Sequence, residues 1–252
     1  MTFDFNWKEY LKDNPNCLMG VINVTPDSFS GDGVLGDTKA ISNLYNEYSD
    51  LGISMVDVGA ESTHPKASPV SLKEEMSRIS FFLENIDPNF IHSIDSYKPK
   101  VISKCLGTDF NVVNDVSGLK DKKIIKILHD RRPGMILNHR HPRSQYLHEK
   151  FQYTNPIEEV KEHLMEKTKD LINSGVSKES IAIDPALGFG KDQEVSYEIL
   201  NNIDQLDYGY PIVIGFSNKK FSRRFGLNNS QLKEYLFSKG VSVIRTHLLD
   251  HL

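Results

Sequence analysis

The chain has 252 residues, of which 38% are hydrophobic and 25% charged, and this length suits one large α/β domain spanning residues 1–252. The formal net charge is −4 and no stretch is dominated by Lys or Arg, so we expect no nucleic-acid partner, because duplex binding needs a basic surface. Cys17 and Cys105 lie in or beside apolar runs and are expected to be buried free thiols, which excludes a disulfide-rich secreted scaffold.

The N-terminal segment mixes acids, aromatic residues and asparagines. It lacks the basic start and apolar stretch of a signal peptide, and no apolar run in the chain reaches membrane-spanning length. We therefore expect a cytoplasmic protein with no membrane contact.

Short apolar runs rich in β-branched residues recur along the chain. They span residues 18–24, 55–61, 91–95, 111–116, 134–140, 181–187, 211–217 and 241–247. Because these runs are almost continuously apolar, we expect strands that are buried on both faces, as in a parallel sheet covered by helices.

Segments with helical periodicity separate these runs. One extends from Thr38 to Leu51 with Gly52 as its C-cap, Pro99 suits the first turn of another, and a long one runs from residues 155–156 to Gly175. Alternating strands and helices indicate βα units, and eight of them favour a closed (β/α)8 TIM barrel over a doubly wound open sheet. The chain is short after the last predicted strand, so we expect the final helix of the barrel to be truncated or absent.

Polar side chains stand at or just after the C-terminal ends of the predicted strands. They are Asn23, Glu61, Asp95, Asn114, His139, Asp184, Ser217, Arg245 and His247. Polar residues can simply mark where strands stop, but in a barrel these ends converge on one mouth, where active sites of this fold lie. A set so rich in acids, amides and bases favours a shared binding site.

The acids and the amide in this set suit a flat ligand. Asp95 and Asp184 only accept hydrogen bonds when ionised, whereas Asn114 both donates and accepts. Together they match a heterocycle with several N–H donors and a carbonyl, such as a guanine-like or pterin ring. A paired general acid and base of the glycosidase type is the alternative, and it explains Asn114 less well.

The cationic part of the set suits an anion. Lys219, Arg245 and His247 could bind a diphosphate, and Asn23 could be an oxygen ligand of Mg²⁺, which prefers few protein oxygens together with phosphate. The glycines of residues 188–192 are expected to allow a tight turn beside a flat ligand, since they lack the spacing of a nucleotide-binding loop. His139 and His141 raise a zinc alternative, but no cysteine or HExxH-type partner accompanies them.

Several segments resemble the signatures of the dihydropteroate synthase family, in that family's order. They are MGVINVTPDSFSGDG (19–33), VDVGAESTHP (56–65), SIDSYK (93–98), NDVSG (114–118), DPALGFGK (184–191), GFSNKKF (215–221) and IRTH (244–247). The similarity extends from about Cys17 to His247, and several signatures in a fixed order are more specific than any one of them. The chain thus resembles a divergent member of the pterin-binding barrel superfamily.

This resemblance implies a transferase of folate biosynthesis, of the kind that sulfonamides target. The family joins 6-hydroxymethyl-7,8-dihydropterin diphosphate to p-aminobenzoate and gives 7,8-dihydropteroate and pyrophosphate. The resemblance implies that the pterin is held by Asp95, Asn114, Asp184 and Lys219 beside Phe189, and that Arg245 covers its ring. It also implies that Arg245 and His247 bind the diphosphate and that Asn23 ligates Mg²⁺. The p-aminobenzoate side would be lined by Thr63, Pro65 and Ser217. Asp95, Lys219, Arg245 and His247 would be the catalytic residues.

The chain departs from the family pattern in its loops. Family members usually have arginine where His64 and Asn218 stand, and an aspartate where Gly31 stands. Neither histidine nor asparagine reproduces the guanidinium fork, so we expect weaker anion capture there, with Arg223 or Arg224 as candidate replacements.

These departures leave two alternatives to an active synthase. One is a paralogue that binds pterin without making dihydropteroate and serves as a binding or regulatory protein. The other is a methyltransferase-type pterin domain, against which the NVTPDSF segment argues. Family members are commonly homodimers that pack through late helices, and a missing last helix argues against that dimer here.

Overall fold

The computed structural model describes residues 4–26, 33–62, 67–146, 148–216 and 220–246. Eight parallel strands close into a barrel in the order of the chain, each pairing with its neighbours in sequence and the last with the first. The strands are β1 (Cys17–Asn23), β2 (Met55–Gly59), β3 (Ile91–Asp95), β4 (Phe110–Asp115), β5 (Gly134–Asn138), β6 (Ile181–Asp184), β7 (Ile212–Gly215) and β8 (Val241–Thr246). The predicted TIM barrel is confirmed, and all eight predicted runs contain a strand.

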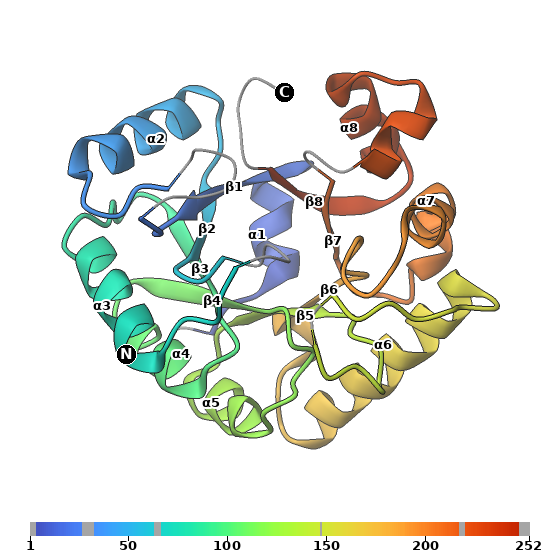
Figure 1. Cartoon of the computed structure of the whole chain (residues 1–252), viewed down its shortest axis with the longest axis horizontal. Helices are drawn as coiled ribbons and strands as arrows, with labels where there is room; N and C mark the ends of the chain where they lie inside the picture. Colours follow the sequence, from blue (N-terminus) through green and yellow to red (C-terminus); the bar gives the residue numbers. More distant parts are fainter. Residues whose placement is uncertain (1–3, 27–32, 63–66, 147, 217–219, 247–252) are drawn as a thin grey trace.

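Helices connect these strands and cover the outside of the barrel (Figure 1). They are α1 (Trp7–Asp13), α2 (Thr38–Asp50), α3 (Leu72–Leu83), α4 (Pro99–Cys105), α5 (Lys123–Arg131), α6 (Pro156–Asn173), α7 (Gln193–Asn201) and α8 (Asn229–Ser238), with short 3-10 helices η1 (Lys178–Ser180), η2 (Ile203–Leu206) and η3 (Lys220–Phe225). Helices α2 to α8 each precede the next strand of the barrel, whereas α1 precedes β1. The expected loss of a final helix concerns residues 247–252, which lie outside the described residues.

Local sequence explains where these helices begin and end. The Asp37 side chain caps α2 by accepting from the Ala40 amide at 2.9 Å, and Pro99 stands in the first turn of α4. Gly52 and Gly175 follow α2 and α6 with φ of +71° and +86°, in the left-handed region that ends a helix at glycine. The predicted helix boundaries at these positions are confirmed.

The apolar core has two parts. One lies between the strands and the surrounding helices and includes Ile22, Val58 and Tyr48. The other fills the barrel interior with side chains from seven strands, namely Met19, Met55, Val112, Ile136, Ala182, Val213 and Val243. Phe5 and the fully buried Trp7 pack against this interior set, so the N-terminal segment closes one end of the barrel.

Both cysteines are buried free thiols, as predicted. Among the described helices, none has the length and apolar character needed to cross a membrane.

Candidate active site at the barrel mouth

The strand ends bring most of the predicted polar residues to one rim. Asn23, Asp95 and Asp184 are the last residues of β1, β3 and β6, and Asn114 and Arg245 are the last but one of β4 and β8. Because the strands are parallel and closed into a ring, these five side chains border the same mouth. Of the other predicted residues, Thr63, Pro65, Ser217, Lys219 and His247 lie outside the described residues, as do the altered positions Gly31, His64 and Asn218.

A guanidinium shared by two carboxylates lies at the centre of this mouth. Arg245 donates from Nε to Asp57 Oδ2 at 2.6 Å and from Nη2 to Asp95 Oδ2 at 3.0 Å. Asp57 belongs to β2, and β8 is the next strand but one in the closed barrel, so this contact joins two strands that are not paired with each other. Asp57 is fully buried, and such charged hydrogen bonds are among the strong ones.

Two carboxamides extend this network across the barrel. Asn114 Nδ2 donates to Asp57 Oδ2 at 2.8 Å, and Asn138 Nδ2 donates to Asn114 Oδ1 at 2.7 Å. The Asn114 carboxamide is therefore held at both its nitrogen and its oxygen. A second N–H and a second lone pair remain on the same group for a ligand.

Sequence reasoning missed Asp57 and Asn138. Asp57 lies inside a strand, whereas the predicted set consists of residues at strand ends, although an acid in the apolar run MVDVG is itself a signal. Asn138 directly precedes His139, which was selected in its place.

His139 faces away from this network. Its ring lies 5.1 Å from the ring of His163 on α6 and 6.3 Å from that of Tyr153, while its backbone N–H donates to Asp184 O at 2.7 Å. Burial lowers the pKa of His139 well below its ordinary value, so the ring is neutral. His139 therefore packs against the helix layer, and its expected place in the shared polar set is wrong.

Asp95 has an unusual electrostatic environment. Burial, and after it the negative charge of Asp57, raises the pKa of the Asp95 carboxyl above its ordinary value, although Arg245 acts in the opposite direction. Gly59 lies beside it in β2, and a Cβ there would be 3.7 Å from Asp95 Oδ2 and 3.8 Å from Asn23 Oδ1. The Asn23 and Asp95 oxygens thus flank a stretch of backbone without a side chain.

The connection after β6 makes the tight turn that its glycines predict. Asp184 Oδ1 accepts from the Ala186 amide at 2.6 Å, and Ala186, Gly188 and Gly190 all have positive φ. Lys191 donates to the backbone carbonyls of Ala186 and Phe189 at 3.3 and 3.1 Å. These bonds hold the Phe189 segment next to Asp184.

A cavity of about 700 Å³ opens from Asp95 across the ends of β3 to β5. Its lining includes Glu61, Tyr97, Lys98, Lys120, Arg140 and Tyr146. This volume is in the range of small-molecule sites.

Arg224, a candidate replacement for the missing arginines, is engaged elsewhere. Its guanidinium pairs with Glu194 and lies over the ring of Tyr197 at 4.3 Å from the centroid, and both partners belong to α7. These contacts direct Arg224 onto the helix layer, so they do not support its proposed compensating role.

Comparison with known proteins points to one group. The model of the family described as "Pterin binding enzyme" matches residues 19–247. The dihydropteroate synthase of Clostridium beijerinckii is 34% identical over 216 residues, which cover 84% of this chain and 78% of that protein. The dihydropteroate synthase of Bacillus subtilis is 31% identical over 211 residues, which cover 82% of this chain and 72% of that protein.

Solved structures give the same result. The dihydropteroate synthase of Clostridium difficile with pteroic acid is 28% identical with a TM-score of 0.75, covering 97% of this chain and 93% of that one. The Burkholderia cenocepacia enzyme with 7,8-dihydropteroate is 26% identical with a TM-score of 0.79, covering 92% and 86%.

Proposed function

The chain belongs to the pterin-binding enzyme family and, within it, to the dihydropteroate synthases, and from this premise we propose that it condenses 6-hydroxymethyl-7,8-dihydropterin diphosphate with p-aminobenzoate. The products would be 7,8-dihydropteroate and pyrophosphate, and we place the reaction in the cytoplasm. The observation that carries the proposal is the continuous network of acids, amides and one guanidinium at the barrel mouth.

This network suits recognition of a pterin ring. Asp95 and Asp184 accept hydrogen bonds from ring N–H groups, and the fixed Asn114 carboxamide supplies one donor and one acceptor in a set orientation. Arg245 is held by Asp57 and Asp95 at the same rim, where its planar group can cover the ring and approach the phosphorylated tail. Phe189, held beside Asp184, adds apolar contact, and Lys219 is proposed as a further donor to the ring on the family resemblance.

The diphosphate is the leaving group, so its developing negative charge must be stabilised. Arg245 and His247 are proposed to grip it, with Asn23 as the protein ligand of Mg²⁺. Among the described residues no group of three or more His, Cys, Asp or Glu side chains is placed to hold a metal. Asn23 ends β1 at the barrel mouth, and a single protein oxygen suits Mg²⁺, which prefers to take most of its ligands from water and phosphate. When bound, Mg²⁺ would neutralise charge on the departing pyrophosphate.

Cleavage of the carbon–oxygen bond leaves positive character on the pterin methylene. The carboxylates of Asp95 and Asp184 border the ring and stabilise this charge, because they are already oriented before the reaction begins. The amine of p-aminobenzoate then attacks the methylene and releases one proton to water as the carbon–nitrogen bond forms. Holding the two substrates in contact supplies much of the remaining rate. Thr63, Pro65 and Ser217 are proposed to line that second substrate, where a sulfonamide would compete.

A pterin-binding protein without synthase activity is the second candidate. It is favoured by the replacement of two family arginines by His64 and Asn218, both on the side of the diphosphate and p-aminobenzoate. The described part of the polar network, with Asp95, Asn114, Asp184 and Arg245, suits the pterin in either case, so both candidates share the pterin site and differ in turnover.

Incubation of the purified protein with the pterin diphosphate, Mg²⁺ and radiolabelled p-aminobenzoate separates the two. The proposal expects labelled dihydropteroate, with the rate lost on chelation of Mg²⁺ by EDTA and restored by excess Mg²⁺. Calorimetric binding of the pterin diphosphate without any labelled product at high protein concentration would rule out the synthase and support the second candidate.

A further inference from the structure

The turn between β6 and α7 is held by a buried lysine. Lys191 is 4% exposed and directly precedes Asp192, the N-cap of α7. Its ammonium group donates to the backbone carbonyl of Ala186 at 3.3 Å and to that of Phe189 at 3.1 Å. The carbonyl of Ala186 also accepts from the Phe189 amide at 3.1 Å, so Lys191 binds the turn at the two residues that close it.

Ala186 has a conformation that needs this support. Its φ is +51°, in the left-handed region, where the Cβ of an L-residue is unfavourably close to the following carbonyl oxygen. Gly188 and Gly190 in the same turn also have positive φ but carry no Cβ. Strained residues persist only where their surroundings hold them, and Lys191 supplies such a hold at the Ala186 carbonyl.

Ala186 links this lysine to the proposed pterin site. Its amide donates to Asp184 Oδ1 at 2.6 Å, and this bond orients the carboxylate. Ala186 therefore connects the ammonium group of Lys191, which binds its carbonyl, to the Asp184 carboxylate, which accepts from its amide. A shift of Ala186 would thus be transmitted to the carboxylate.

Phe189 lies on the mouth side of the same turn. Its ring is 5.6 Å from that of His148, and His148 lines the cavity that opens from Asp95. Because Lys191 binds the Phe189 carbonyl, it acts on the backbone that carries this ring. The lysine thus holds both the acid and the aromatic side chain of the turn in one arrangement.

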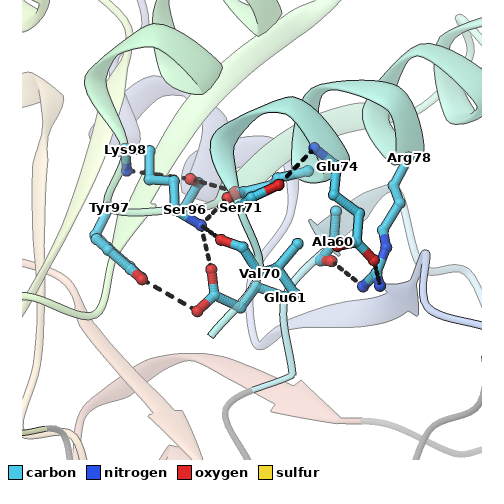
Figure 2. A network of polar contacts seen from close by, with 10 residues as sticks. Ala60, Glu61, Val70, Ser71, Glu74, Arg78, Ser96, Tyr97 and Lys98 are labelled. Carbon is cyan, nitrogen blue, oxygen red and sulfur yellow. Dashed lines mark hydrogen bonds and ion pairs between the residues drawn. The ribbon is translucent and has the colours of Figure 1, made fainter. Parts of the chain in front are cut away.

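A second lysine near the mouth has a different environment. Lys98 is half-buried and pairs with the carboxylates of Glu61 (Figure 2) and Glu75. The two carbonyls that Lys191 binds are neutral peptide groups. Removing an ammonium group from water is costly, and buried charges add little to stability even when they are paired. The place of Lys191 is therefore better explained by the geometry of the turn than by stability.

We propose that Lys191 is a positioning residue for the pterin: by binding the Ala186 and Phe189 carbonyls, it fixes the turn so that Asp184 and Phe189 meet the ring together. The inference rests on the proposed function, in which Asp184 accepts from ring N–H groups and Phe189 adds apolar contact. Lys191 itself is assigned no contact with the pterin. Its loss should therefore weaken pterin binding by displacing other groups.

Calorimetry of Lys191→Met with 6-hydroxymethyl-7,8-dihydropterin diphosphate and Mg²⁺ tests this role, at a temperature where the variant is folded. Methionine is of similar length but donates no hydrogen bond. We expect the Kd to rise by at least about tenfold, because a misplacement of binding groups by about 1 Å has effects of this size or larger. Should Lys191→Met not fold, Lys191→Gln replaces it, because the shorter carboxamide cannot restore both bonds, and the same rise is expected. An unchanged Kd would overturn the proposal.

Two controls separate positioning from a general loss of hydrogen bonds or of stability. Lys161→Met makes the same substitution in α6, where the ammonium group donates to the Gln205 carbonyl at 2.8 Å. Asp192→Ala removes the cap of α7, whose side chain accepts from the Val195 amide at 2.9 Å, and leaves the bonds of Lys191 in place. We expect Asp192→Ala to lower the melting temperature, and the Kd of both controls to stay within about twofold. A rise in either control equal to that in Lys191→Met would count against positioning and overturn the proposal.

Hydrogen exchange followed by mass spectrometry gives a readout that needs no ligand. The amides of Ala186, Gly188 and Phe189 are hydrogen-bonded, so their exchange reports on the order of the turn. We expect a peptide covering residues 186–190 to exchange faster in Lys191→Met than in the wild type or Lys161→Met. Faster exchange in the variant, together with no pterin binding by the wild type, would refute the proposed function and leave the role of Lys191 in fixing the turn intact. Equal exchange in the wild type and Lys191→Met would refute that role.

Discussion

The side chains at the barrel mouth hold one another before any ligand arrives. Arg245 is placed by Asp57 and Asp95, and Asn114 by Asp57 and Asn138. Groups that are already oriented need little reorganisation when a ligand binds, so their hydrogen bonds count more toward affinity. Residues that do not touch the ligand, such as Asn138, are therefore expected to matter for binding.

Asn138→Leu tests this expectation. Leucine is of similar size but cannot donate to Asn114 Oδ1, so the carboxamide of Asn114 loses its fixed orientation. We expect the affinity for the pterin diphosphate to fall about tenfold and the free energy of unfolding to fall by about 1–3 kcal/mol. Calorimetry and urea denaturation measure the two effects. The exposed Asn173→Leu is the control, and unchanged pterin affinity in Asn138→Leu would refute the role given to Asn138.

At this scale the sequence predicted a part of the site. The sequence correctly placed five residues at the mouth, because parallel strands in a barrel bring their C-terminal ends together whatever the details of packing. These residues are Asn23, Asp95, Asn114, Asp184 and Arg245. Asp57 was not predicted, since its contacts come from β4 and β8, which are not neighbours of β2 in the sheet and meet it only through inward-facing side chains. Which inward-facing residues meet there depends on barrel closure and register, and a strand pattern does not specify these.

At the scale of elements, the predicted strands agree with the structure at their starts more closely than at their ends. The run 181–187 gives a strand that stops at Asp184, because Pro185 has no N–H to donate to the sheet and Ala186 has φ of +51°. Likewise, the strand predicted over 55–61 ends at Gly59, and the Glu61 side chain pairs with Lys98 instead of continuing the strand. Hydrophobic runs continue past the strand because the loops at the mouth are themselves partly buried.

Strand β1 and helix α2 meet through a contact that leaves no room for a side chain. A Cβ on Gly20 would lie 2.6 Å from the ring of Tyr48, whose hydroxyl accepts from Val21 N and donates to Val21 O. We expect Gly20→Ala to displace this ring and lower the free energy of unfolding by about 2 kcal/mol or more. Gly215→Ala in β7 is the control, because among the described residues the atom nearest to its Cβ would be the Arg245 carbonyl oxygen, at 3.9 Å. Equal midpoints of urea denaturation for the two variants would contradict this packing.

Strand β3 contributes a buried histidine to the helix layer, and this predicts a dependence of stability on pH. His92 lies among Tyr45, Phe82 and Phe110, and burial lowers its pKa to about 4. The unfolded chain takes up a proton near pH 6.5 while the folded protein does not, so stability present at pH 7 is lost as the pH falls from 6.5 toward 4.

His92→Gln should remove this part of the acid sensitivity. Between pH 7 and pH 4.5 we expect the variant to lose about 2 kcal/mol less unfolding free energy than the wild type. The exposed His129→Gln on α5 should behave as the wild type does. Parallel pH profiles of urea denaturation for His92→Gln and the wild type would show that His92 does not titrate in this way.

At the scale of the whole molecule, one end of the barrel is filled by apolar packing and the other carries the polar side chains of the site. Apolar side chains fill one end, which Phe5 and Trp7 close, and the opposite end carries the acids, amides and Arg245. The sequence predicted the barrel but assigned no role to the N-terminal segment, because helical propensity does not say what a short helix covers. The packing of the closed end is therefore separate from the residues that bind the ligand, although a buried mouth residue such as Asn138 is expected to affect stability as well as affinity.

The central claim is that the acids and amides at this mouth form a pterin site. Isothermal titration calorimetry with 6-hydroxymethyl-7,8-dihydropterin diphosphate and Mg²⁺ tests it most directly, on the wild type, on Asp184→Ala and on the exposed control Asp130→Ala. We expect saturable binding by the wild type and the control and no measurable heat with Asp184→Ala, because the carboxylate that accepts the ring N–H groups is gone. Equal affinity of Asp184→Ala and the wild type would contradict the account.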